Sequence, residues 1–439
     1  MSNAPRIRAL VLAELCNPEW VSGPLVGWSH AFALSKNADV HLVTHEMNEP
    51  AIERSSWPRD RVTFIRLASY EKLKVWFTHR VLRSDHTTQM FTAVGIPFYW
   101  LFERLTWQLL GKRIQGGDFD VVHRITPVSP VVSSPITKRL SRAGVPFVLG
   151  PINGGLPWPK GYANALQKER EAVNRFRSVY QHAPFLSSTW RDAAALLVAS
   201  RATWEEIPER HRSRCFYLPE NGILETTVSR ESRGPLTKPL RAVFVGRLTP
   251  YKCADVAIRG LAPAIKRGDV VLDILGDGPE RAYLERIVRE EGIGEQTTFH
   301  GWLEHKDTLR LLGQAHLQVF PSIREFGGGV VVEGMALGVV PIVMAYGGPA
   351  EIVDDRTGFR LPLESAESTA RQIDRIVSQL LAKPERWLPM SDACRERIRD
   401  EFTWEAKAKR SISVYEHVLG RAPRPELSPP PPPSPLLSV

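Results

Sequence analysis

Short apolar runs recur along the whole chain, and longer stretches of mixed composition separate them. Runs of four to eight apolar residues are typical of buried strands, and the stretches between them have the pattern of covering helices. We predict strands at 8–15, 40–44, 62–67, 121–125, 146–150, 195–200 and 215–219, and again at 241–245, 270–275, 297–300, 317–320 and 341–344. Such alternation favours an α/β fold with parallel sheets covered by helices.

The two series of strands predict two domains. A chain of 439 residues exceeds one ordinary core and suits two domains of roughly 200 residues. Residues 226–239 are polar with two prolines and a glycine, which indicates a linker. We expect doubly wound, Rossmann-like domains over 1–225 and 240–400 that face an interdomain cleft. A helix is predicted at 401–420, and a disordered Pro-rich tail at 421–439.

Composition and charge narrow the class of protein. The chain is 43% hydrophobic and 24% charged, as expected of a globular protein. Its net charge is +9, of which residues 1–225 carry +8. A basic half suits nucleic acid, anionic lipid or an acidic substrate. The chain has no run of five basic residues and no zinc-finger or RNA-recognition motif, so we predict no nucleic-acid partner.

The spacing of the cysteines and the length of the apolar segments indicate in which cellular compartment the protein is expected. The four cysteines form no Cys-x-x-Cys pair, so neither a zinc site nor a disulfide framework is indicated. The N-terminal segment has the pattern of a first buried strand rather than a signal peptide. Residues 87–102 are apolar but shorter than the ~20 residues of a membrane span. We therefore predict a protein of the reducing cytoplasm.

Residues 73–83 and 91–113 mix aromatic with basic side chains. Such a surface could lie on an anionic leaflet, and a helical face packed into the first domain explains the aromatics equally well. Peripheral contact of the N-terminal domain with the inner face of the membrane is thus a hypothesis.

The segment 320–351 is the most informative about chemistry. It places Glu325 and Glu333 eight positions apart around Gly327, Gly328 and Gly329. Three glycines between a predicted strand and an apolar helix let backbone amides approach an anion at the helix start. Glu333 follows about one turn into the helix, so both carboxylates can face one pocket. A pyrophosphate and sugar hydroxyls would suit such a pocket.

A second segment carries two cations. The strand at 241–245 is followed by Gly246, Arg247 and Lys252, and a helix is predicted to begin near Cys253. A glycine at a strand end, cations and a helix N-terminus together favour a pyrophosphate site. Either cation alone could be a solvated loop charge; their occurrence together with the Glu-x7-Glu segment favours the functional interpretation.

These two segments resemble the donor-binding signature of family-4 (group 1) glycosyltransferases, which are retaining GT-B enzymes that use nucleotide sugars. The resemblance implies that Arg247 and Lys252 grip the diphosphate and neutralise the departing nucleotide. It places Glu325 near the donor sugar and Glu333 on the ribose. The cations would stand in for a metal ion, so we expect no metal and no cofactor besides the donor substrate. Relatives usually have Glu-Gly-Phe-Gly where this chain has Glu-Phe-Gly-Gly, which shifts the glycines by one residue.

The resemblance also suggests weaker candidates. Gly276 would bound the nucleotide base, and Gly23 and Gly27 would bring a glycine turn to the diphosphate. His123 would be delivered to the cleft by its strand, although in many relatives the histidine lies two positions later, where this chain has Ile125. A core histidine at a strand end explains His123 equally well.

Three further expectations follow from the resemblance and the residues beside it. The loop at 150–155, with the following Trp158, is expected to line the acceptor side, and the C-terminal helix to pack back on the first domain. Asp118-Phe119-Asp120 spells the Asp-x-Asp of metal-dependent transferases, but it precedes a strand far from the donor motifs, so no metal is assigned to it.

The sequence thus predicts an enzyme that transfers a sugar from a nucleotide-diphosphate sugar to a glycan or lipid-linked acceptor, with retention and without metal. Two alternatives stay open: a nucleotide-sugar epimerase of the same fold, and a non-enzymatic protein that binds nucleotide sugars or membranes.

Overall fold

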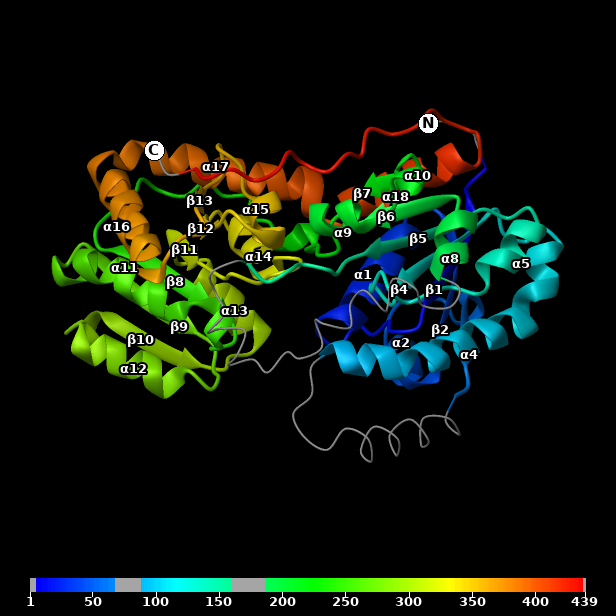
Figure 1. Ribbon diagram of the computed structural model, residues 1–439, viewed down its shortest axis with the longest axis horizontal. Coiled ribbons are helices and arrows are strands. Elements are labelled where there is room, and N and C mark those ends of the chain that lie inside the picture. The colour runs from blue at the N-terminus through cyan, green and yellow to red at the C-terminus, as the bar shows by residue number, and fades with distance from the viewer. Residues whose placement is uncertain (1–4, 68–87, 160–185, 437–439) are drawn as a thin grey trace. The chain divides into compact units, whose positions relative to one another are not determined.

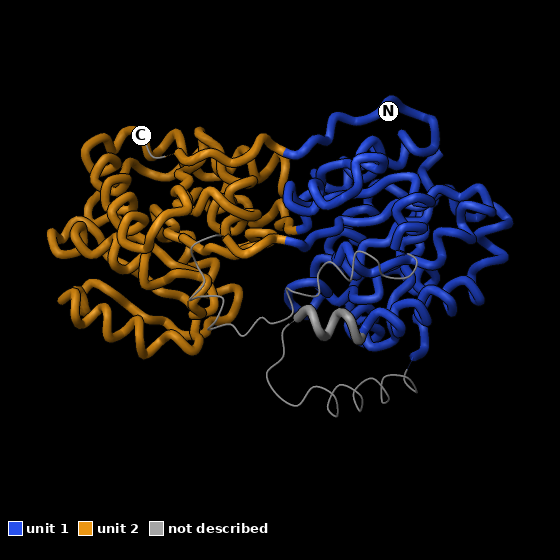
Figure 2. The backbone as a smooth tube through the Cα atoms, viewed as in Figure 1, with its two compact units in different colours: residues 1–155, 171–220, 404–429 blue, residues 156–170, 221–403, 430–439 orange. Residues whose placement is uncertain are grey.

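The computed structural model describes residues 5–67, 88–159 and 186–436, which form two compact units (Figures 1 and 2). Of these residues, unit 1 holds those up to Gly155, together with 186–220 and 404–429. Unit 2 holds 156–159, 221–403 and 430–436. The chain therefore leaves each unit and returns to it, and each unit is built from segments distant in sequence.

Unit 1 is built on a parallel sheet of seven strands in the order β3-β2-β1-β4-β5-β6-β7. The strands are β1 (Arg8–Ala13), β2 (Asp39–His45), β3 (Val62–Ile65), β4 (Val121–Thr126), β5 (Phe147–Ile152), β6 (Ala195–Val198) and β7 (Cys215–Tyr217). Side chains of β1 alternate between the two faces: Val11 packs in one core cluster, and Leu10 and Leu12 pack in the other. Both faces are therefore buried, as the apolar runs predicted.

Helices cover both faces of this sheet (Figure 1). They are α1 (Gly23–Ser35), α2 (Glu49–Glu53), α4 (Thr88–Gln115), α5 (Thr137–Arg142), α8 (Leu186–Asp192), α9 (Arg201–Glu206), α10 (Glu209–Arg212) and α18 (Trp404–Val418). The core on one face includes residues of α1, α2 and α18; the core on the other includes residues of α4, α5 and α8. The C-terminal helix α18 belongs to unit 1 and packs on α1.

Helix α4 contains the described part of the aromatic and basic segment. Its Tyr99 and Phe102 are buried in the core, so these aromatics support the sheet. Arg104, Lys112 and Arg113 are exposed. Residues 73–83 lie outside the described part of the chain. Among the described helices, none combines the length and apolarity that crossing a membrane requires.

Unit 2 is built on a parallel sheet of six strands in the order β10-β9-β8-β11-β12-β13. The strands are β8 (Leu240–Val245), β9 (Val270–Leu275), β10 (Thr297–Gly301), β11 (Leu317–Phe320), β12 (Val340–Met344) and β13 (Phe359–Leu361). The helices are α11 (Ala254–Lys266), α12 (Arg281–Glu290), α13 (His305–Leu312), α14 (Gly329–Ala336), α15 (Gly347–Ile352), α16 (Ala366–Ala382) and α17 (Trp387–Arg397). The two sheets confirm the predicted pair of Rossmann-like domains; β13 was not predicted.

The segment predicted as a linker packs onto unit 2. Ser229 N donates to the carbonyl of Ala336 at 2.9 Å, and the Arg233 guanidinium donates to the carbonyl of Gly313 at 2.7 Å. The chain passes from unit 1 to unit 2 between Glu220 and Asn221, so the predicted linker residues belong to unit 2.

The tail differs from the disorder that its prolines predicted. In unit 1, Tyr217 N donates to the carbonyl of Leu427 at 2.7 Å; in unit 2, Leu436 and Arg360 exchange two backbone hydrogen bonds. Tyr217 and Arg360 lie on β7 and β13, the last strands of their sheets. Edge strands carry unpaired backbone groups, and the tail satisfies part of them up to residue 436.

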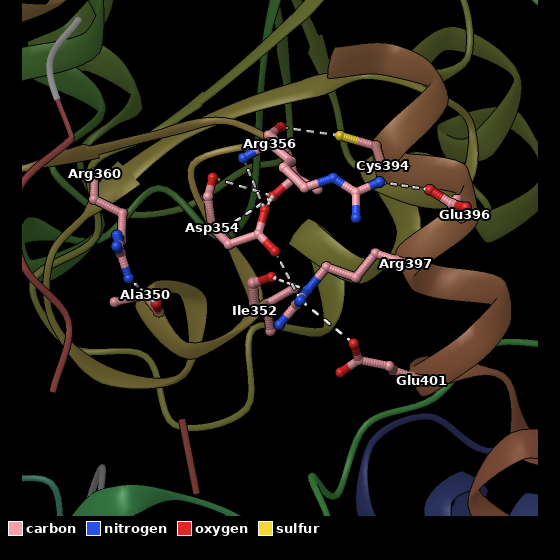
Figure 3. Close-up of polar contacts among 10 residues, drawn as sticks. Ala350, Ile352, Asp354, Arg356, Arg360, Cys394, Glu396, Arg397 and Glu401 are labelled. Carbon is pink, nitrogen blue, oxygen red and sulfur yellow. Dashed lines mark hydrogen bonds and ion pairs between the residues drawn. The ribbon is translucent and has the colours of Figure 1, made fainter. Parts of the chain in front are cut away.

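A polar network holds the end of α15 against α17 (Figure 3). The Arg397 guanidinium donates to the carbonyl of Ile352 and to Asp354, both at 2.8 Å, and lies 3.4 Å from Glu401. Cys394 Sγ donates to the carbonyl of Thr357 at 3.0 Å. A surface pocket of about 610 Å³ lies beside this network, lined in part by Asp355, Arg356 and Leu436. None of the predicted site residues lines it.

Candidate functional site

Two neighbouring strands of unit 2 end in loops that touch backbone to backbone. A Cβ on Gly276, after β9, would lie 2.0 Å from the carbonyl oxygen of Gly246, after β8. One on Gly278 would lie 2.4 Å from the carbonyl oxygen of Leu248, and Leu248 N donates to the carbonyl of Asp277 at 2.9 Å. Only glycine permits this approach. The predicted donor loops therefore form one surface at the carboxyl edge of the sheet, where ligands bind in such folds.

Lys252 and Glu325, 73 residues apart in sequence, form an ion pair. Lys252 ends the 3₁₀ turn Pro250–Lys252 before α11, and Glu325 lies in the loop after β11. Their side chains are 13% and 21% exposed, and Lys252 Nζ lies 4.8 Å from the centroid of the Phe320 ring. The structure thus brings the cation segment and the Glu-x7-Glu segment into direct contact.

The glycines of the loop after β11 shape the start of α14. Gly328 has φ +61° and precedes the first residue of the helix, Gly329. Gly348 N donates to the carbonyl of Glu325 at 3.0 Å, and a Cβ on Gly348 would lie 2.2 Å from the carbonyl of Phe326. The loop after β11 therefore packs on Gly347 and Gly348, the glycine pair that begins α15. First-turn amides of a helix lack intrahelical partners, so the start of α14 suits an anion.

Glu333 lies in the second turn of α14 and accepts a hydrogen bond from His305 Nε2 at 3.0 Å. This hydrogen bond raises the pKa of His305 above its ordinary value. The Glu333 side chain is 27% exposed, so part of the carboxylate faces solvent. Sequence reasoning missed His305, since nothing in its surroundings marks it; only the packing of α13 on α14 brings it to Glu333.

Arg247 lies on the same loop as Lys252 but differs from it in environment. Its side chain is exposed, and within the described ranges no ion pair to its guanidinium is found. A cation in this setting can turn towards an incoming phosphate without breaking an existing contact.

His123 is placed in the core of unit 1. It is fully buried on β4; its Nδ1 lies 2.5 Å from Tyr415 Oη and its Nε2 lies 2.6 Å from the carbonyl of Gly150. Burial lowers the pKa of His123 to about 4. A carbonyl only accepts, so Nε2 carries the proton and Nδ1 accepts from Tyr415. This geometry agrees with the core interpretation: His123 ties β4 to β5 and α18 and cannot reach a substrate as it stands.

The remaining N-terminal candidates occupy α1 and the loop after β5. A Cβ on Gly27 would lie 2.1 Å from the carbonyl of Leu15, so this glycine permits the close packing of α1. A Cβ on Gly23, at the start of α1, would meet nothing within 4 Å. In the loop at 150–155, Asn153 Oδ1 accepts a hydrogen bond from Ser200 Oγ at 2.8 Å. The residues that follow this loop, 156–159, belong to unit 2.

The Asp-x-Asp segment is occupied by ion pairs. Asp118 lies 2.8 Å from Arg113, and Asp120 lies 2.6 Å from Arg8. Burial raises the pKa of Asp120, but hydrogen bonds from Arg8 together outweigh it and hold that pKa below its usual value. In the described part of the chain, no group of three His, Cys, Asp or Glu side chains is arranged to hold a metal ion.

Comparison with known proteins agrees with this geometry. Residues 225–391 match the family model of glycosyl transferases group 1. The 2-deoxystreptamine glucosyltransferase of Streptomyces kanamyceticus is 27% identical over 350 residues, which cover 75% of this chain and 84% of that protein. Glycogen synthase of Mycobacterium tuberculosis is 28% identical over 238 residues, which cover 51% of this chain and 54% of that enzyme.

Solved structures support the fold. The structure of Anabaena Alr3699/HepE in complex with UDP superimposes with a TM-score of 0.58 at 14% identity, covering 94% of this chain and all of that one. This likeness and the two parallel sheets confirm the predicted GT-B fold. The group 1 match lies in unit 2 and contains both the segment with Arg247 and Lys252 and the Glu-x7-Glu segment.

Proposed function

We propose that this protein is a retaining glycosyltransferase that takes a sugar from a nucleotide-diphosphate donor and passes it to a glycan or lipid-linked acceptor. The observation that carries the proposal is the contact between Lys252 and Glu325, because it joins the two donor segments at the carboxyl edge of one sheet. The group 1 match over this region and the glycosyltransferases among its relatives support it.

The chemistry follows from the charges at this edge. As the bond to the anomeric carbon breaks, negative charge grows on the leaving diphosphate, and fixed cations at that position lower the barrier. Arg247 and Lys252 supply those cations in the proposal, together with the first-turn amides of α14. They take the role that a metal ion has in other transferases, so transfer is proposed to proceed without one.

The two glutamates divide the rest of the donor between them. A carboxylate can accept hydrogen bonds from both hydroxyls of a vicinal diol, which suits Glu333 to the ribose. Glu325 serves the sugar end, beside the cation that binds the diphosphate. Retention of configuration rests on the resemblance to the family and is part of the proposal.

The first experiment is a thermal-shift screen of the purified protein against UDP-, GDP- and ADP-sugars, each with and without EDTA. UDP is the first probe, since a structure of similar fold was solved with it. A donor that raises the melting temperature equally in EDTA, and whose nucleotide is released only when an acceptor is added, supports transfer without metal. Donor turnover to an isomeric sugar without any acceptor would instead identify an epimerase.

Site variants then test the assignment. Charge-assisted hydrogen bonds contribute roughly 1.5 to 3 kcal/mol, so Arg247→Ala should slow transfer by about 10-fold to a few hundred-fold. Arg286→Ala is the matched control, because Arg286 is an exposed cation on α12 whose nearest carboxylate, on Glu290, is 3.7 Å away. Equal rates for both variants would refute the role of Arg247.

A further inference from the structure

Residues 156–159 are anchored on Tyr346 and Gly347, where α15 begins. Leu156 is buried, and a Cβ on Gly347 would lie 3.0 Å from its Cδ2. Tyr346 Oη donates a hydrogen bond to the carbonyl of Pro157 at 2.5 Å. Pro159 is buried as well. This segment was expected to belong with the loop at 150–155, and its contacts instead lie with the loops that carry the proposed donor site.

The same segment holds the residue that precedes Glu325. The guanidinium carbon of Arg324 lies 4.9 Å from the centroid of the Trp158 ring and 5.4 Å from that of Phe326. Trp158 is half-buried and packs against the hydrophobic core of unit 2. A planar guanidinium interacts favourably with aromatic faces, and each such contact stabilises the arrangement modestly.

A loop with three consecutive glycines needs such an anchor. Glycine loses more conformational freedom on ordering than any other residue, and Gly327, Gly328 and Gly329 offer no side chain to hold the chain in place. The carboxylate of Glu325 is useful only if the backbone beneath it is fixed. Its carbonyl is held by Gly348 N on one side, and the Trp158 stack holds the adjacent residue on the other.

We propose that Trp158 and Arg324 are positioning residues for donor-sugar transfer: their stack fixes the loop on which Glu325 faces the sugar end of the donor. This inference rests on the proposed function and deepens it, because it adds a segment outside the donor motifs to the same site. Trp158 acts through the loop, so it affects the sugar end and leaves the nucleotide end, at Glu333, unchanged.

The test separates nucleotide binding from turnover. Affinity for UDP, GDP and ADP is measured by calorimetry, and kcat and KM are measured by nucleotide release from the matching sugar donor. Cation–π contacts of this kind correspond to about 3- to 30-fold in an equilibrium or rate. Trp158→Ala should therefore lower kcat about 3- to 30-fold with nucleotide affinity unchanged within twofold. Trp158→Phe keeps an aromatic face and should recover most of the rate, and Arg324→Lys, which loses the planar stack, should behave like Trp158→Ala.

Tyr283→Ala is the matched control. Tyr283 is also half-buried against the core of unit 2 and has the Arg286 guanidinium 5.4 Å from its ring centroid, but it lies on α12. The inference would be overturned if Tyr283→Ala lost as much kcat as Trp158→Ala. It would also be overturned if Trp158→Ala lost nucleotide affinity together with kcat, because either result would mean that Trp158 only stabilises the fold. Normal turnover in Trp158→Ala would overturn it too and leave the donor site intact, whereas failure of the wild type to bind any nucleotide would refute the proposed function itself.

Discussion

The ion pair between Lys252 and Glu325 predicts an unusual response to substitution. If Lys252 binds the donor diphosphate, the nucleotide must compete with Glu325 for the same ammonium group. Glu325→Gln removes the competing charge and keeps the shape of the side chain. We therefore expect Glu325→Gln to bind UDP, or the nucleotide that the screen identifies, more tightly than the wild type, and to transfer sugar more slowly.

The burial of the pair sets the magnitude. Exposed ion pairs contribute 0 to 1 kcal/mol, and breaking a fully buried one costs about 3 to 5 kcal/mol. At 13% and 21% side-chain exposure this pair lies between the two, so we expect a coupling of about 1 to 2 kcal/mol, which is about 5- to 30-fold in affinity. The free energy of unfolding of Glu325→Gln without ligand should fall by a similar amount.

Calorimetry on a double-mutant cycle checks this reasoning. Lys252→Met should weaken nucleotide binding at least tenfold, and adding Glu325→Gln to it should change nothing further, because no ammonium group is left to release. Glu291→Gln is the control, since it removes a carboxylate that pairs with Lys266 at 2.8 Å on the surface of the same unit. Weaker nucleotide binding by Glu325→Gln than by the wild type would refute the competition.

Three further predictions concern stability. The raised pKa of His305 means that its bond to Glu333 stabilises the fold fully below the unfolded pKa of about 6.5 and progressively less as pH rises through the raised value. In urea unfolding from pH 5.5 to 8.5, the difference in stability between the wild type and His305→Gln should therefore shrink, because the other titrating groups act alike in both proteins and cancel. Gly27→Ala should lower the free energy of unfolding by more than about 2 kcal/mol, because its Cβ would overlap a backbone carbonyl 2.1 Å away. Gly23→Ala has open space around it and should change the free energy of unfolding, measured by thermal unfolding, by no more than about 1 kcal/mol. Burial lowers the pKa of Lys407 to about 7, so the folded state binds fewer protons than the unfolded state between about pH 7 and 10.4. The free energy of unfolding of the wild type should therefore rise across that range more than that of Lys407→Met. Parallel plots of unfolding free energy against pH for the two proteins would contradict the lowered pKa of Lys407.

The sheets could be predicted because their strands are buried on both faces. A strand such as β6 or β12 is a continuous apolar run, and the helices between such strands leave few other folds open. β13 escaped prediction because it is only three residues long and its middle residue is Arg360. The order of the tail escaped for a different reason: the partners of Leu427 and Leu436 are backbone groups of edge strands, and composition does not encode them.

The donor segments could be predicted because each is local: glycines, acids and cations recur there at fixed spacing. Contacts between segments that are distant in sequence could not be predicted. Nothing near Trp158 in the sequence links it to Arg324, and the approach of His305 to Glu333 depends on how α13 packs on α14. His123 shows the opposite case. A histidine within a buried strand has the same sequence pattern whether its ring faces a ligand or, as here, Tyr415 and a backbone carbonyl.

Each acid of the Glu-x7-Glu segment already has a partner in unit 2, and this has a consequence for donor binding. Glu325 pairs with Lys252 and Glu333 accepts from His305, so both carboxylates are held in place before a donor arrives. Holding them in advance reduces the ordering that binding must impose. It also means that a donor gains only the difference between its own contacts and those it displaces, so affinity should depend most on groups without such a contact. Arg247, exposed on the same surface and without an ion pair in the described ranges, is the residue that fits this role. Arg247→Ala should therefore lower kcat/KM for the donor more than removal of the side chain of His305 or of His123.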